Sequence, residues 1–152
     1  MFRGLSAVQI DSKGRITIPA NYRTLMVEEA SGSLVATIDT EEKCLLLYPF
    51  PQWQVIEEKL EALPSFQPAA RRIQRLLLGH ATEMELDRQG RILLPPLLRD
   101  YAGLDSAVIM VGQGKKIEIW NESAWEDARV TWLSEGMGEN HTVPMELAMM
   151  SL

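Results

Sequence analysis

The 152-residue sequence predicts an α+β fold that is mainly β with short helices, built from two copies of one unit. The phrase DSKGRITIP at residues 11–19 returns as DRQGRILLP at residues 87–95, with Asp, Gly, Arg and Pro at matching places. Two further strand-like stretches follow each copy, so both halves repeat one order of elements. A unit of roughly 50 residues with so much strand edge is too small to be stable alone. We therefore expect the pseudo-symmetric halves to pair their strands and close a β-barrel, which removes exposed edges.

The repeated phrase has the composition of a tight turn between two short strands. Asp11 and Asp87 can each accept hydrogen bonds from backbone N–H groups a few residues later, which closes a turn. Gly14 and Gly90 can adopt a positive φ without steric cost. These four residues are therefore predicted to form the turns.

A short helix is expected after each phrase. Pro19 and Pro95 lack an N–H donor, so each should end its strand and suit the first turn of a helix. The segments that follow are NYRTLM in the first half and PLLRDYA in the second, and Gly103 is the expected stop of the latter. The later elements also correspond: the expected strands are 33–39 and 44–50 in the first half and 106–112 and 116–122 in the second, and the expected Trp-bearing helices are 51–63 and 123–133.

Residues 64–80 join the halves and favour a helix from Pro68 to Leu78. One face of this helix carries Ile73, Leu76 and Leu77, and the other carries Arg71, Arg72 and Arg75. Such an arginine face is usually solvated, with an interface or a phosphate contact as the alternative. The predicted domains are a first repeat with its helix at 1–63, a linker helix at 64–80, and a second repeat with C-terminal helix and tail at 81–152.

Charge is distributed unevenly along the chain. The net charge is −6 and the pI about 5.0, which taken alone disfavours a nucleic-acid partner. Residues 1–26 nevertheless carry four basic side chains against one acidic, and residues 71–99 carry six against three, whereas residues 118–152 carry one against seven. A phosphate backbone responds to the local field within about 8–10 Å, so the basic segments around the two phrases are the relevant ones.

The composition is typical of a soluble cytoplasmic protein, with 46% hydrophobic and 24% charged residues. No apolar run reaches the ~18 residues that a membrane span needs. The N-terminus lacks the pattern of a secretory signal. The single cysteine, Cys44, lies in an apolar run and is expected to be a buried thiol.

Basic side chains beside the two turns indicate double-stranded DNA as the partner. Arg15 and Arg91 occupy the same place in the repeat, while Lys13 lies in the first turn and Arg88 in the second. A two-stranded ribbon fits the DNA major groove, which is about 12 Å wide, and the planar fork of arginine matches guanine edges and phosphates. We expect the two arginines Arg15 and Arg91 to contact bases or phosphates, and Lys13 and Arg88 to contact phosphates. Arg3 is a further DNA-binding candidate.

A purely structural interpretation of the same residues stays open. Asp11 and Arg15 are four residues apart across a turn, and they could pair with each other simply to hold the loop. A surface ion pair contributes only about 0–1 kcal/mol, which is little reason to duplicate it. The aspartates are therefore expected to build the turns, and the arginines to face outward.

The sequence offers no set of residues for catalysis or cofactor binding. The serines lack a nucleophile pattern such as GxSxG, and GQGKK at residues 112–116 is too short for a phosphate loop and favours a hairpin turn. His80 and His141 have no cysteine or acidic neighbour at ligand spacing. We predict a protein that is not an enzyme and uses no metal, cofactor or small-molecule substrate.

Four segments of the chain, MFRG, DSKGRITIP, RRIQRLLLGHATE and DRQGRILLP, closely resemble the MraZ family of bacterial DNA-binding transcriptional regulators. The resemblance covers essentially the whole chain, including both copies of the DxxxR signature. It implies two SpoVT/AbrB-type domains in one chain, a swapped-hairpin AbrB-like barrel, and a ring of many subunits. It also implies binding to short promoter repeats, repression of the chain's own division and cell-wall operon, and a nucleoid-associated location. In the second copy Gln89 stands where the first has Lys13, so equal contacts of both turns with DNA do not follow.

An antitoxin-like module on the same barrel, whose main partner is another protein, is the alternative function. Co-purification of a stoichiometric partner, without DNA binding at low salt, would favour it.

Overall fold

The computed structural model describes residues 1–136 and 144–150. The chain divides into two units, Met1–Glu122 and Ser123–Leu152. His141, considered above as a metal ligand, lies outside the described residues. Within the described part of the chain, no helix combines the length and the apolar character needed to span a bilayer.

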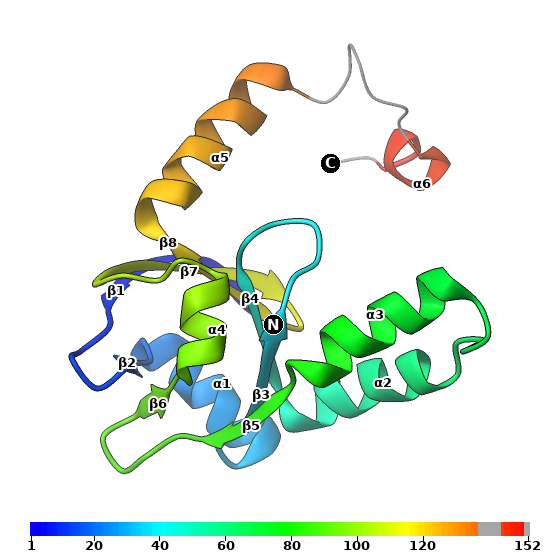
Figure 1. The fold of residues 1–152 in the computed structure, drawn as a ribbon. Helices are drawn as coiled ribbons and strands as arrows, with labels where there is room; N and C mark the ends of the chain where they lie inside the picture. Colours follow the sequence, from blue (N-terminus) through cyan, green and yellow to red (C-terminus); the bar gives the residue numbers. More distant parts are fainter. Residues whose placement is uncertain (137–143, 151–152) are drawn as a thin grey trace. The chain divides into compact units, whose positions relative to one another are not determined.

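A six-stranded antiparallel sheet interleaves strands of the two halves (Figure 1). Its strands, in spatial order, are β1 (Phe2–Gln9), β7 (Ala107–Gly114), β8 (Ile117–Asn121), β4 (Leu45–Pro49), β3 (Ser33–Ile38) and β5 (Thr82–Glu85). The order is the same from either end, because β1 corresponds to β5 in the repeat, β7 to β3, and β8 to β4. The first strand of each half pairs with the other half, with Phe2 opposite Gly114 and Ser33 opposite Glu85. Neither half therefore has a complete sheet of its own.

The strands inside the repeated phrases pair with each other in a separate two-stranded ribbon. β2 (Arg15–Thr17) and β6 (Arg91–Leu93) run antiparallel, and Ile16 lies opposite Ile92 at the centre. The ribbon therefore has the same approximate twofold symmetry as the large sheet.

The closed barrel expected from the sequence is not shown. The large sheet is open, with β1 and β5 at its two ends, and a bridge between Ile10 and Ile16 connects the ribbon to β1. Pro19 and Pro95 explain why the ribbon is short, since each follows its strand closely and cannot donate to a ladder. The expected α+β class, with antiparallel strands and short helices, is confirmed.

Each phrase is followed by a helix, as the sequence predicts: α1 (Ala20–Ala30) in the first half and α4 (Pro96–Tyr101) in the second. α1 is longer than expected, because no glycine or proline interrupts it before residue 32. It ends where Ser31 and Gly32 adopt positive φ angles of 54° and 81°.

Two longer helices lie side by side next to β3 (Figure 1): α2 (Phe50–Glu61) and α3 (Pro68–Gly79). α3 corresponds to the helix predicted from Pro68 to Leu78. The Thr37 hydroxyl of β3 donates to the Leu77 carbonyl of α3 at 2.7 Å, which ties the helix to the sheet.

Both halves contribute to one main hydrophobic core. Ile16 and Ile92 are 0% and 1% exposed at its centre. The surrounding buried side chains are Phe2, Ile18, Tyr22, Met26, Leu34, Ala36, Ile38, Leu45, Leu47, Leu94, Leu98, Ala102, Val108, Met110, Ile117 and Ile119. Burying one large aliphatic side chain stabilises a fold by about 1.5–3 kcal/mol, so neither half retains the full stabilisation without the other.

The second unit contains α6 (Met145–Ala148) and nearly all of α5 (Glu122–Glu135). α5 is the Trp-bearing helix expected at 123–133, and its Trp125 and Trp132 rings meet edge to face with centroids 6.0 Å apart. The domain limits at 63 and 80 stay predictions.

Candidate nucleic-acid interface

The carboxylate of one aspartate organises the first turn. Asp11 Oδ1 accepts the backbone N–H groups of Lys13 and Arg15, both at 2.9 Å. Its Oδ2 accepts Arg15 Nε at 2.7 Å. Gly14, with φ of 86°, donates its N–H to the Asp11 carbonyl at 3.0 Å. The turn is thus closed by both the main chain and the side chain of Asp11.

The second turn repeats these bonds. Asp87 Oδ1 accepts the N–H groups of Gln89 and Arg91 at 2.9 Å, and its Oδ2 accepts Arg91 Nε at 2.8 Å. Gly90, with φ of 73°, donates to the Asp87 carbonyl at 3.0 Å. The repeated sequence therefore produces a repeated local geometry.

Hydrogen bonding stabilises the ionised form of both carboxylates. The Arg15 N–H is the largest cause that lowers the pKa of Asp11, from 3.8 to about 2. The Arg91 N–H has the same role in lowering the pKa of Asp87. Both aspartates therefore carry a full negative charge beside their arginines at neutral pH.

Each arginine uses only its Nε–H and its backbone within the turn. The terminal amino groups of Arg15 and Arg91 have no hydrogen-bond acceptor among residues 1–136 and 144–150, and their side chains are 29% and 25% exposed. The ion pair therefore orients the guanidinium and leaves its outer edge available. The pairing of each arginine with its aspartate and an outward-facing guanidinium, which the sequence left as alternatives, occur together in this geometry.

Pairing within the ribbon places both arginines on one face. Arg15 lies opposite Leu93, and Arg91 lies opposite Thr17. Because side chains alternate along a strand, the central isoleucine pair points into the core and these four residues point away from it. Arg15 and Arg91 are diagonal neighbours across the two strands, a relation that places their Cα atoms about 7–8 Å apart. Two guanidinium groups thus project from one surface.

Two further arginines, absent from the predicted site, lie over the turns. A Cβ atom added to Gly14 would come 2.9 Å from Cζ of Arg99, and one added to Gly90 would overlap Arg23. Arg99 also donates from Nε to the Leu94 carbonyl at 3.0 Å. Arg23 and Arg99 occupy matching places in the repeat, but only the fold shows that each covers the turn of the other half.

Comparison with known proteins identifies the family. The family model described as "MraZ protein, putative antitoxin-like" matches residues 1–76 and again residues 77–137. The chain belongs to the MraZ family. Proteins named "Transcriptional regulator MraZ" are 62% identical in Coxiella burnetii (strain RSA 493 / Nine Mile phase I), 54% in Legionella pneumophila (strain Paris) and 47% in Halorhodospira halophila (strain DSM 244 / SL1), each over the full length of both chains. The resemblance seen in the sequence, with its two repeats, is confirmed.

The MraZ relatives are named as regulators of transcription and not as enzymes. The prediction of a non-enzymatic family is therefore confirmed.

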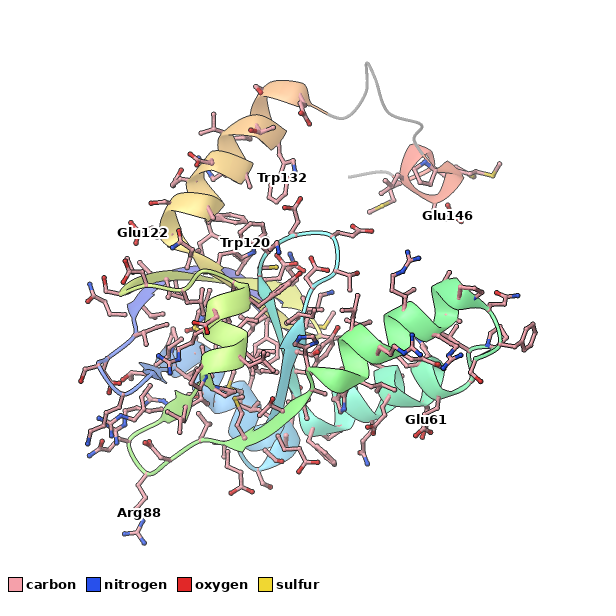
Figure 2. All side chains as sticks on the ribbon, viewed as in Figure 1. Glu61, Arg88, Trp120, Glu122, Trp132 and Glu146 are labelled. Atoms are coloured by element: carbon pink, nitrogen blue, oxygen red, sulfur yellow. The ribbon has the colours of Figure 1, made fainter. Side chains whose placement is uncertain are left out.

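The remaining predicted site residues of this MraZ-family chain differ in position. Lys13 and Arg88 are exposed at the turns, and Figure 2 shows Arg88 extending away from the body of the protein. Arg3 is exposed on β1, opposite Gln113. It lies at the other end of the strand from Gln9, roughly 20 Å away for a rise of about 3.3 Å per residue. The fold therefore does not bring Arg3 to the turn that follows β1.

One set of potential metal ligands in the MraZ-family fold went unnoticed in the sequence. Ligand atoms of Asp39, Cys44 and Glu118 all lie within 4.8 Å of one another. Asp39 and Cys44 flank the loop between β3 and β4, whereas Glu118 lies far along the chain on β8, so no spacing motif could predict the set. Burial raises the pKa of the Cys44 thiol, whose sulfur lies 3.8 Å from Asp39 Oδ2. The protonated thiol can thus donate to this carboxylate, and we assign the trio no metal.

Proposed function

We propose that this chain is a sequence-specific DNA-binding transcriptional regulator. The observation that carries the proposal is the pair of guanidinium groups on one face of the ribbon, each oriented by its own aspartate. The names of its full-length relatives, at 47–62% identity, support the same function.

The chemistry of the pair suits a duplex. With Nε held by a carboxylate, Arg15 and Arg91 each keep two terminal amino groups that can donate in parallel to a guanine edge or a phosphate. Lys13 and Arg88 extend the positive charge toward neighbouring phosphates. The net negative charge of the chain is compatible with this role, because only charges near the turns act on the duplex.

We also propose that several copies form a ring that binds short promoter repeats and represses the operon of division and cell-wall genes to which its own gene belongs. Weak contacts from successive copies add through effective concentration when the spacing of the DNA repeats matches that of the subunits. A cytoplasmic, nucleoid-associated location follows from this role. The exchange of first strands between the halves supports a swapped-hairpin AbrB-like arrangement of the ribbon and sheet.

Arg15→Ala and Arg91→Ala test the DNA contacts. Fluorescence anisotropy with a duplex from the region upstream of the gene, measured over a salt series, gives both the affinity and the salt slope. Loss of a base-reading arginine should cost about 1–3 kcal/mol, and loss of a phosphate contact should reduce the salt slope by about one. The oligomer should persist in both variants.

The exposed residue Lys59 on α2 offers a matched control, since Lys59→Ala removes one positive charge far along the chain from either turn. It should leave binding unchanged. Unaltered affinity and salt slope in the Arg15→Ala, Arg91→Ala double variant would contradict the proposed interface.

An antitoxin-like interaction module is the second candidate, and the description of the matching family model favours it. It requires a stoichiometric protein partner on purification and no binding of the upstream duplex at low salt. DNA binding that depends on Arg15 would exclude it as the main function.

A further inference from the structure

We propose that the basic face of α3 is the docking surface for α5 of a second copy of this chain. This inference rests on the proposed oligomer and assigns the contact that builds it.

The basic face consists of Arg71, Arg72 and Arg75, all exposed. In the described part of the chain, no carboxylate lies within 4.0 Å of any of the three. The same arginines line a groove of about 420 Å³ together with Phe66, which is 82% exposed. Three unpaired positive charges beside an exposed aromatic ring fit a partner that is both acidic and apolar.

The opposite face of α3 is already engaged, so the arginines cannot turn inward. Ala70 is buried, and the Gln74 amide donates to the Leu60 carbonyl of α2 at 2.9 Å. The bond from Thr37 to Leu77 fixes the same side on the sheet. The basic face therefore points away from α2 and from the sheet.

The position of α3 favours a protein partner over DNA. Within the first unit, α2 and α3 lie on the side of the sheet away from the β1–β2 and β5–β6 turns (Figure 1). A duplex seated on the ribbon through Arg15 and Arg91 would meet the opposite side of the unit from α3.

One face of α5 has the complementary chemistry. Glu122, Glu126, Val130 and Leu133 follow one another at spacings of four, four and three residues, which aligns them along one side of a helix. All four are exposed, Val130 at 59% and Leu133 at 67%. In the described residues no basic group lies within 4.0 Å of either glutamate. Figure 2 shows Glu122 at the start of this helix.

The two faces match in an antiparallel register. On α3 the order is Phe66, then Arg71, then Arg75. Read backwards, α5 presents its apolar pair, then Glu126, then Glu122. The charged residues on both helices are four apart, about 6 Å along the axis. This register pairs Arg71 with Glu126 and Arg75 with Glu122, and places the Phe66 ring over Val130 and Leu133.

Such a contact is head-to-tail, because each copy offers one basic face and one acidic stripe. Repeated contacts of this kind generate a ring when the rotation closes. The acidic residues of α5 and the basic residues of α3 thus take part in one contact between copies.

Charge reversal tests the contact. In sedimentation velocity, Arg71→Glu and Glu126→Arg should each weaken self-association at least about ten-fold, because each places like charges opposite one another. An equimolar mixture of the two variants should assemble again, since every contact between unlike copies then joins opposite charges. Lys59→Glu and Glu29→Arg, at exposed positions on α2 and α1, are matched controls and should assemble like the original chain.

Three outcomes would overturn the inference. The first is unchanged assembly of both single variants, or a monomeric original chain at every concentration. The second is that a chain carrying both Arg71→Glu and Glu126→Arg assembles normally while the mixture of the two single variants does not. This result indicates docking within a chain. The third is loss of DNA binding in Arg71→Glu with its assembly intact, which assigns the face to DNA. Failure of the proposed function is distinct, because it shows as absent DNA binding by the original, assembled chain.

Discussion

The role of each site residue is set by which of its atoms is already bonded. Asp11 uses one carboxylate oxygen for two backbone N–H groups and the other for Arg15 Nε. It therefore builds the turn and aims the guanidinium at once. The sequence left the Asp11–Arg15 pairing and an outward-facing arginine as alternatives, because residue spacing alone does not show which donors of an arginine remain available.

Acid should destabilise the turns, because it protonates the carboxylates of Asp11 and Asp87. The pKa of Asp11 is about 2 in the fold, below its ordinary value of 3.8, and the pKa of Asp87 is lowered too. The folded state therefore prefers the ionised form, and this stabilisation is present above pH 3.8 and lost as the pH falls toward 2. Because both carboxylates are exposed, we expect a modest effect.

Urea unfolding from about pH 5 down to about pH 2 would measure this acid dependence. The advantage of the original chain over the Asp11→Asn, Asp87→Asn double variant should shrink across that range. Asp100→Asn is the control, since Asp100 is exposed and its carboxylate accepts no hydrogen bond from residues 1–136 and 144–150. An advantage that stays constant with pH would show that the carboxylate charge contributes nothing to the turns.

At the scale of elements, prediction worked where a strand or helix carries its own pattern. The β-branched and apolar runs that form β3, β4, β7 and β8 were found within about two residues, the usual uncertainty of element ends. β1 extends over Phe2–Gln9 and so begins well before the strand-like run VQID at residues 8–11, because pairing with β7 continues through Gly4 and Ser6. Tertiary pairing thus overrides weak local propensity. The contacts of Arg23 and Arg99 with the opposite turns likewise depend on the tertiary fold and not on local sequence.

Substitutions of glycines test whether Arg23 covers the turn of the other half. Gly103→Ala meets nothing within 4 Å and should cost only the strain of a positive φ, about 1–2 kcal/mol. Gly90→Ala adds an overlap with Arg23 and should cost more. Arg23→Ala should remove the excess, so the two changes should couple in a double-mutant cycle by at least about 0.5 kcal/mol. Additive effects in thermal or urea unfolding would mean that Arg23 does not rest on the turn in solution.

At the scale of the whole molecule, the sequence predicted a shared core and two pseudo-symmetric halves, but neither the strand order nor the open sheet. Hydrophobic alternation shows which face of a strand is buried, and it does not specify a partner more than 80 residues away, as with Ser6 opposite Met110. The expectation of a closed barrel came from the exposed strand edges of two small halves, and the family resemblance added a swapped-hairpin form of it. The short ribbon is a consequence of where Pro19 and Pro95 stop its two strands.

Interleaving makes a strong prediction about separated halves. Fragments 1–65 and 66–152, divided in the loop between α2 and α3, each lose the partner of their first strand and one member of the central pair of Ile16 and Ile92. Neither should form a folded monomer, since each would expose the core face of β3 or β7 to water. Mixed together, the fragments should recover native circular dichroism and the mass of the complete chain in light scattering, as should a full chain cleaved within that loop after folding. A monomeric fragment that unfolds cooperatively by itself would show that one repeat holds a sufficient core, and that the exchange of first strands is not what stabilises this fold.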